Sequence, residues 1–368
     1  MDAPVASPVL DLFLELAAIP SPSGKERAVA ERVRGYLRGL GLAIEDDAAG
    51  NLLARLDPTA TDGGRPIFLC AHLDTVPPAG PIDPVVDAGI VRNAAGTILG
   101  ADDKAAVAVL LEAARLVLAD GRPHAGVELL FTVREETGLE GAKAFDHTRL
   151  RATIGFVYDY SGPVGDVVAA APHARTIDVV FKGRPAHSGI APEEGRSAIA
   201  AAARAIADLR LGRIDDETTA NIGRISGGSA RNVVPDRCLL AAEARSRDER
   251  KLAALVEEML EGFAFAAAVT ECEVETSVEE SYRGYRFRPD DDAFRLALSA
   301  LERAGFSPRP VAVGGGADAN VFNARGLACV NLANGMAHVH TPEEEIAVAD
   351  LDAMLAVTLE LVGAAADA

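Results

Sequence analysis

Basic side chains, long apolar runs and cysteines are scarce in this chain of 368 residues, and each scarcity excludes a class of protein. Its 36 lysines and arginines stand against 55 aspartates and glutamates, a formal net charge of −19. The sequence has no basic stripe of the kind that nucleic-acid-binding proteins carry, so we expect no nucleic-acid partner. No apolar run is long enough to span a bilayer, and the charge disfavours an anionic membrane surface, so we expect no membrane partner. The acidic balance has two interpretations: solubility alone, or a cleft whose carboxylates bind cations.

The few cysteines indicate a reducing compartment. Cys70, Cys238, Cys272 and Cys329 are far apart and form no Cys-x-x-Cys pair. This spacing fits buried thiols better than a disulfide framework or a structural zinc site. The first twenty residues lack a basic segment and carry acidic residues within their apolar stretch, unlike a secretory signal peptide. We therefore expect a cytoplasmic protein.

Two regions, residues 1–174 and 288–368, alternate apolar strands with helices. Residues 67–70 form a continuous apolar run typical of a buried strand, residues 104–118 have a helical pattern, and residues 127–133 repeat the buried strand. This alternation predicts an α/β domain, a mixed sheet sandwiched by helices. In such sheets the functional groups collect at the carboxyl ends of the strands.

The pattern changes between residues 175 and 287. Strands and helices there follow the order β-α-β-β-α-β, which is typical of a ferredoxin-like α+β unit. We predict that this region is a separate domain inserted into the larger one.

Acidic and imidazole side chains follow the predicted strands where each strand ends. These groups are His72-x-Asp74, Glu135-Glu136, Asp159, His340 and the pair Asp102-Asp103 that opens a helix. Imidazole and carboxylate are the usual ligands of zinc, and two neighbouring metals need a bridging carboxylate. A further carboxylate that is not a ligand can transfer the proton. Taken singly, each group has a plainer interpretation: Asp102-Asp103 can complement a helix dipole, and Glu135-Glu136 can be a solvated face. Their repetition at one sheet edge favours the metal site.

The motifs AHLDTV, LGADDKAA, TVREETGLEGA, VYDY, GRPAHSG and HVHTPEE resemble those of the peptidase T, carboxypeptidase G and aminoacylase family of co-catalytic zinc hydrolases. Three segments, GADDKA, EETGLEGA and GGGADANVFNARG, are most similar to the peptidase T-like branch. The resemblance implies the zinc exopeptidase fold and two Zn²⁺ per subunit, with Co²⁺ or Mn²⁺ as alternatives. One departure is Ile98-Leu99-Gly100, where the family often has Gly-Arg-Gly before its bridging aspartate.

The resemblance also implies a role for each matched residue of the metal site. His72 and Asp159 would bind one metal, Glu136 and His340 the other, and Asp102 would bridge both. Glu135 would be the general base, which takes a proton from water and returns it to the leaving amine. Asp74 would hold the His72 ring in its ligating tautomer. The family also implies a cis peptide bond between Asp102 and Asp103.

The inserted domain would serve as a lid and as the dimerisation module of a homodimer. His187 resembles the family histidine that reaches the partner subunit's active site; an exposed turn histidine is the alternative. Asn232 and Arg245 resemble the substrate-binding pair, and an arginine can hold a substrate carboxylate with two parallel hydrogen bonds. Gly315 lies in a glycine run that would let the substrate backbone approach, or that forms a plain tight turn.

These residues predict a dizinc hydrolase that cleaves the amide bond of short peptides, as a tripeptidase- or aminopeptidase-like exopeptidase. A deacylase or carboxypeptidase for N-acyl amino acids is an alternative with the same metal chemistry. A non-catalytic metal-binding protein is a third alternative, and it is disfavoured because Glu135 and all five ligand positions carry suitable residues.

Overall fold

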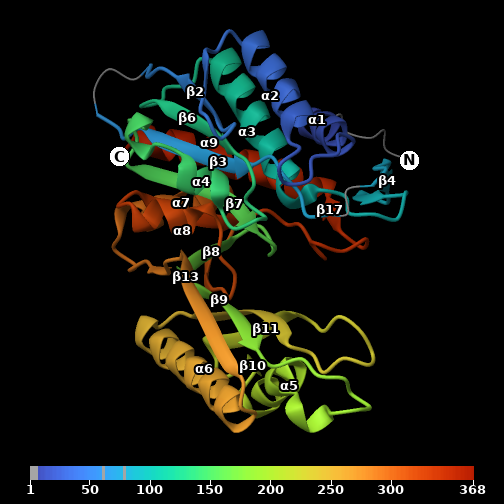
Figure 1. Cartoon of the computed structure of the whole chain (residues 1–368). Helices are drawn as coiled ribbons and strands as arrows, with labels where there is room; N and C mark the ends of the chain where they lie inside the picture. Colours follow the sequence, from blue (N-terminus) through green and yellow to red (C-terminus); the bar gives the residue numbers. More distant parts are fainter. Residues whose placement is uncertain (1–6, 60–62, 78–79) are drawn as a thin grey trace. The chain divides into compact units, whose positions relative to one another are not determined.

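The computed structural model describes residues 7–59, 63–77 and 80–368, which form two compact units (Figure 1). The first unit comprises the described residues of Met1–Ala169 together with Arg286–Ala312 and Ala317–Ala368. The second unit comprises Ala170–Tyr285 and the short segment Val313–Gly316. This short segment belongs to the second unit although the chain on both sides of it belongs to the first.

A mixed sheet forms the centre of the first unit. Within the described residues it has nine strands in the order β1-β2-β6-β3-β7-β16-β8-β14, with β15 paired to β8. The four strands β6, β3, β7 and β16 are parallel to their neighbours among them, so their carboxyl ends lie at one edge. Figure 1 shows β3 between β6 and β7. The strands are β1 (Ile44–Asp46), β2 (Leu52–Leu56), β3 (Ile67–His72), β6 (Val127–Thr132), β7 (Ile154–Tyr160), β8 (Asp166–Ala171), β14 (Tyr285–Arg286), β15 (Arg309–Ala312) and β16 (Ala328–Ala333).

Helices cover both faces of this sheet, which confirms the predicted α/β fold. Successive side chains of a strand point to opposite faces. Leu69 packs in the main core together with α1, α2, α3, α7 and α9, whereas Phe68 faces the other side. There its ring meets Phe322 of α8 edge to face, with 5.1 Å between ring centroids, and α4 packs beside α8. The helices are α1 (Pro8–Ala17), α2 (Arg27–Gly39), α3 (Ala101–Asp120), α4 (Glu140–Ala144), α7 (Asp292–Arg303), α8 (Asp318–Ala324) and α9 (Val348–Ala366), with the 3-10 helix η1 (His147–Arg149).

A small antiparallel sheet that the sequence patterns do not predict also belongs to the first unit. Its strands are β4 (Pro84–Asp87), β5 (Ile90–Asn93) and β17 (Glu345–Ala347), in the order β17-β5-β4. Strands of three or four residues are too short for a recognisable alternation. Because β17 begins at Glu345, its pairing with β5 fixes the chain directly after the HVHTPEE motif.

The second unit is an antiparallel sheet with two helices on one face. Its strand order is β10-β11-β12-β9-β13, and α5 and α6 cover the face that carries Ile177 and Phe181. Apart from the two-residue β10, the elements follow the expected order β-α-β-β-α-β. They are β9 (His173–Lys182), η2 (Pro192–Glu194), α5 (Ala198–Asp208), β10 (Gly212–Arg213), β11 (Thr218–Gly227), β12 (Arg237–Ser246), α6 (Glu249–Val269) and β13 (Glu273–Tyr282). Over both units, the helices within the described ranges fall short of the length and apolar character that a membrane crossing requires.

Candidate metal centre

The carboxyl edge of the parallel strands gathers side chains from five segments of the first unit. His72 is the last residue of β3, Glu136 follows β6, and Asp159 is the penultimate residue of β7. His340 lies in the connection between β16 and β17. Asp102 comes from the start of α3, where its dihedral angles and those of Asp103 are not helical. The peptide bond between Asp102 and Asp103 is cis, as the family resemblance implied.

Asp102 lies between two histidines. Its Oδ1 is 3.0 Å from His72 Nε2, and its Oδ2 is 3.2 Å from His340 Nε2. His340 Nε2 is also 3.1 Å from Glu136 Oε1. Among the described residues, donor atoms within 4.8 Å of one another form three groups: His72, Asp102 and Asp159; His72, Glu135 and Glu136; and Asp102, Glu136 and His340. The first and third groups share Asp102, which is the arrangement that a bridging carboxylate requires.

The imidazoles of this centre offset only part of its negative charge. Burial opposes the charge of Asp102, but the contacts with His340 and His72 outweigh burial and lower the pKa of this carboxyl. Burial raises the pKa of Glu135, and the charge of Asp159 adds to this effect. Burial and then the charge of Asp102 raise the pKa of Asp159 in turn. Hydrogen bonds to two carboxylates raise the pKa of the His340 imidazole to about 10, and Asp102 has a larger effect than Glu136.

This donor set fits a pair of divalent cations. Crowded carboxylates and imidazoles are the ligands that zinc prefers, and cations would offset the repulsion among the acidic groups. The chemistry of the donors and their two overlapping groups therefore support metal binding by His72, Asp102, Glu136, Asp159 and His340.

Asp74 is fully buried and joins the strand that ends at His72 to the segment of the two glutamates. Its carboxylate accepts hydrogen bonds from the backbone N–H groups of Glu135 and Glu136, at 2.9 and 3.1 Å, and from Ser23 Oγ at 2.7 Å. His72 Nδ1 lies 3.0 Å from the Asp74 carbonyl oxygen and 3.5 Å from Asp74 Oδ1. Asp74 therefore contacts the ring whose tautomer it was expected to fix, and it also holds the backbone of Glu135.

Comparison with known proteins agrees with this geometry. Residues 68–364 match the model of the peptidase family M20/M25/M40. The chain belongs to this family. This membership confirms the family resemblance that the motifs indicated. It also confirms the predicted enzyme class, because the family is one of peptidases.

Three similar proteins cover nearly the whole length of this family member. The aminopeptidase PepT from Bacillus cereus has 38% sequence identity and a TM-score of 0.87, with 98% of each chain covered. A tripeptidase from Staphylococcus aureus has 34% identity and a TM-score of 0.92, again with 98% of each chain covered. An uncharacterized protein of Bacillus subtilis, YqjE, is 38% identical over 352 residues, which are 93% of this chain and 94% of the relative.

Two asparagines beside the metal centre have no role assigned from the sequence alone. Asn331 Oδ1 accepts a hydrogen bond from Asp159 N, and its Nδ2 donates to Asp159 O, both at 2.9 Å. Asn334 Nδ2 donates to Tyr158 O at 2.8 Å and lies 3.4 Å from Asp103 Oδ1. Both asparagines are buried. A signal was present, because asparagines interrupt the apolar segment ACVNLANG at the carboxyl end of a predicted strand.

Two buried ionisable groups near the centre were also without an assigned role. Lys104 is fully buried, its Nζ donates to Ile19 O at 2.6 Å, and burial lowers its pKa to about 7. Asp318 is buried as well, and burial raises its pKa to about 6. Its Oδ2 accepts a hydrogen bond from Thr132 Oγ1 at 2.6 Å, whereas Oδ1 has no hydrogen-bond partner among the described residues. Both residues stand inside the quoted motifs, but a motif alone does not say what a side chain contacts.

Two of the predicted residues of the second unit lie together. His187 and Asn232 are exposed and occupy neighbouring loops, where Ser188 N donates to Asn232 O at 3.0 Å and His187 pairs with Val233. The Nδ1 of His187 accepts a hydrogen bond from Gly189 N at 3.2 Å. This bond leaves Nε2 as the ring atom that can carry a proton toward solvent.

Arg245 and Gly315 lie elsewhere in the second unit. Arg245 is on β12, and its Nη2 donates to Glu243 Oε2 at 2.8 Å, while its buried Nε has no hydrogen-bond partner among the described residues. Gly315 is exposed, with no heavy atom within 4 Å of the position that a Cβ would occupy. In the same run Gly316 is packed closely, since a Cβ there would lie 2.4 Å from the ring of Tyr282.

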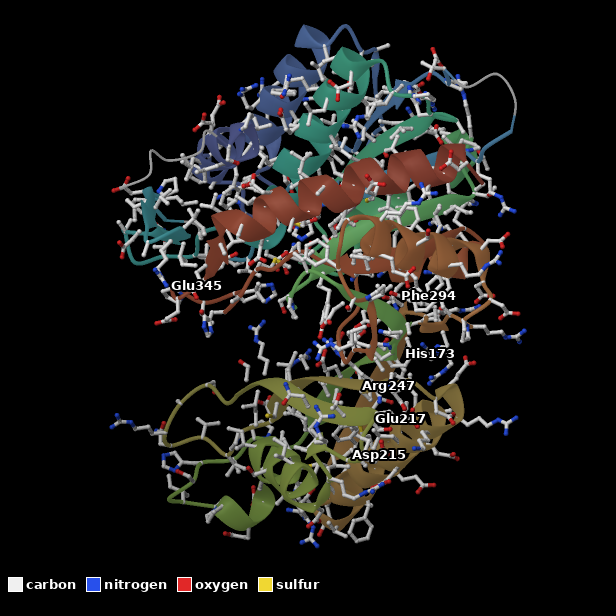
Figure 2. The ribbon with its side chains drawn as sticks, turned by 180° about the vertical axis from the view of Figure 1, so that it is seen from behind. His173, Asp215, Glu217, Arg247, Phe294 and Glu345 are labelled. Carbon is white, nitrogen blue, oxygen red and sulfur yellow. The ribbon has the colours of Figure 1, made fainter. Side chains whose placement is uncertain are left out.

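Arg247, a second arginine near this strand, contacts the segment before β11. Its Nη2 donates to Asp216 O at 2.9 Å, and its Nε is 4.0 Å from Glu217 Oε2. Figure 2 shows Arg247 and Glu217 side by side. Both arginines therefore have an acidic neighbour, Glu243 for Arg245 and Glu217 for Arg247.

Proposed function

We propose that this chain is a dizinc exopeptidase that hydrolyses short peptides, tripeptides foremost, from the amino end. The observation that carries the proposal is the position of Asp102, whose two oxygens face His72 and His340 from opposite sides. The similarity to the aminopeptidase from Bacillus cereus and the tripeptidase from Staphylococcus aureus supports the choice of substrate.

The residues of the first unit would divide the work as follows. His72 and Asp159 would hold one zinc ion, Glu136 and His340 would hold the other, and Asp102 would be shared by both. Bound zinc would supply a nucleophilic water at neutral pH and polarise the scissile carbonyl. Co²⁺ and Mn²⁺ are alternatives, because both are divalent cations that accept carboxylate ligands.

Glu135 is the proposed general base. It is buried and adjoins the ligand Glu136, so its carboxylate can take the proton of the attacking water and return it to the leaving amine. Asp74 keeps Glu135 in place through the bond to its backbone N–H. Glu135 would thus transfer the proton, Asp74 would hold Glu135 in position, and the five ligands would hold the metals.

We assign substrate binding and dimer formation to the second unit. Arg245 would pair with the substrate carboxylate, as the family resemblance implies, and Asn232 and Gly315 would contact the peptide. His187 would stabilise the oxyanion in the partner subunit of a homodimer. The four cysteines are all free thiols, which supports a cytoplasmic location.

The test is a panel of dipeptides, tripeptides and N-acyl amino acids, incubated with the purified protein at fixed zinc. We expect the fastest hydrolysis for tripeptides with a free amino end. Faster release from N-acyl amino acids would replace the proposal with a deacylase, and the absence of hydrolysis by protein with two bound zinc ions would refute a peptidase.

Glu135→Gln tests the mechanism within the same panel. It should keep both metals and lose about 10²- to 10⁴-fold in turnover, because the general base is removed while the ligands remain. Glu140→Gln is the matched control, since Glu140 is exposed, pairs with Arg134 and belongs to the same segment. A wild-type rate in Glu135→Gln would exclude Glu135 as the base.

A further inference from the structure

Glu344, which directly precedes β17, is a buried carboxylate whose side chain lies beside the start of α3. It is 2% exposed, and it follows His340 by four residues. Its Oε2 accepts hydrogen bonds from the backbone N–H groups of Leu99 and Gly100, both at 2.8 Å. Its Oε1 accepts a third bond, from Asp102 N at 3.0 Å. One side chain thus satisfies three backbone donors of the segment that carries the bridging aspartate.

These three hydrogen bonds bind a segment whose backbone is not regularly helical. Regular helical dihedral angles begin only after Asp103, and Gly100 has a φ of 77°. The first N–H groups of a helix have no partner within the helix, and a negative charge is favourable at that end. Glu344 provides both the acceptors and the charge, so it fixes the backbone on which the Asp102 side chain stands.

The other end of Glu344 belongs to the loop that presents His340. Backbone bonds between Ala337 and Glu345, in both directions at 2.9 and 3.0 Å, close this loop at its base. Within the loop His338 and His340 have φ values of 55° and 66°, a left-handed conformation that is uncommon for residues other than glycine. The loop therefore holds His340 in an unfavourable backbone conformation, which contacts with other segments must stabilise. Glu344 lies at the base of this loop.

We propose that Glu344 is a positioning residue that couples the segment of Asp102 to the loop of His340, so that the metal site they share is formed before metal binds. The inference rests on the proposed dizinc function, because it assigns a purpose to Glu344 only where Asp102 and His340 are ligands. Glu344 itself offers no donor atom to any of the three metal groups.

The test compares Glu344→Gln with Glu128→Gln. Glu128 is 3% exposed and lies near the amino end of β6, whereas the metal centre lies at the carboxyl end. Like Glu344, it accepts bonds from backbone N–H groups, those of Arg151 and Ala152 at 2.8 and 2.9 Å. The readouts are the two zinc affinities, measured by competition with a chromophoric chelator, and the visible spectrum of the Co²⁺-substituted protein.

Glu344→Gln should weaken the binding of at least one zinc ion by about 10- to 100-fold and alter the Co²⁺ spectrum, as is typical when a group that orients a ligand is changed. Glu128→Gln should leave both affinities and the spectrum unchanged, even if it lowers the melting temperature. Unchanged zinc affinities in Glu344→Gln would overturn the inference, as would equal losses in both variants. A wild-type protein that binds no zinc would instead overturn the proposed function.

Hydrogen exchange of the wild-type protein tests the same point without a variant, in case Glu344→Gln does not fold. The amides of Leu99, Gly100 and Asp102 should be protected in the metal-free protein nearly as well as in the zinc-loaded protein, because Glu344 already binds them. Rapid exchange of these amides without zinc would mean that metal binding, not Glu344, organises the segment, and would overturn the inference.

Discussion

Removing the metal ions should destabilise the first unit and leave the second unit unaffected. All five proposed ligands belong to the first unit, and a ligand that binds only the folded state stabilises it by about 2.7 kcal/mol when its free concentration is 100 times its dissociation constant. Two such sites would contribute about 5 kcal/mol. For a domain of this size, 1 kcal/mol changes the melting temperature by about 2–4 °C. Chelation should therefore lower the melting temperature of the first unit by about 10–20 °C.

Calorimetry with a chelator, followed by restoration of zinc, measures this shift, and hydrogen exchange shows where it arises. Segments around His72 and Glu136 should gain protection with zinc, whereas β9, β11 and β12 should not. Asp102→Asn is the control, because it removes a charged oxygen shared by both sites and should reduce the zinc-dependent shift. The reasoning is refuted if the melting temperature is the same with and without zinc, or if Asp102→Asn keeps the full shift.

Two further predictions concern Arg245 and Asp318. Arg245→Ala should raise KM for peptides with a free carboxylate and leave kcat nearly unchanged. The control variant Arg237→Ala, on the same strand, should change neither constant. Equal kinetics of the two variants would exclude a role of Arg245 in substrate binding. Burial raises the pKa of Asp318 to about 6, above its value in the unfolded chain, so its contribution to stability is present below about pH 4 and is lost as the pH rises through 6. Urea unfolding of the metal-free protein should therefore show a smaller loss of stability between pH 5 and 7.5 in Asp318→Asn than in the wild type, and identical pH profiles would contradict this.

The sequence was sufficient to predict the α/β fold because its strands are apolar throughout and their helices are long. Residues 67–70 and 127–132 lie in the parallel part of the sheet, and a parallel strand that is covered on both faces requires such a continuous run. The pattern also placed acidic or imidazole groups at or beside the ends of the three inner strands, and the parallel direction of these strands brings His72, Glu136 and Asp159 to one edge. The choice of five ligands, with Asp102 from α3 and His340 from a connection, came from the family resemblance.

Such patterns do not predict which side chains of distant segments form hydrogen bonds. Glu344 and Asp102 are 242 residues apart, and Asn331 is 172 residues from Asp159. Hydrogen bonds of this kind depend on side-chain direction and distance, which neither periodicity nor spacing specifies. The small sheet that includes β17 was missed because its strands are too short to show a period.

The contacts of Glu344 also explain why Asp102, the proposed bridging residue, can follow Ile98-Leu99-Gly100 in this chain. Glu344 binds the backbone N–H groups of Leu99 and Gly100, and a backbone donor is the same whatever side chain it carries. Leu99 can therefore be an apolar core residue, as its complete burial shows, without weakening the support of Asp102. Gly100 is constrained differently: its φ of 77° favours glycine, and a Cβ would lie 3.2 Å from Thr75 Cγ2. The position of Asp102 thus depends on a glycine before it and a carboxylate far along the chain, and much less on the side chains at positions 98 and 99.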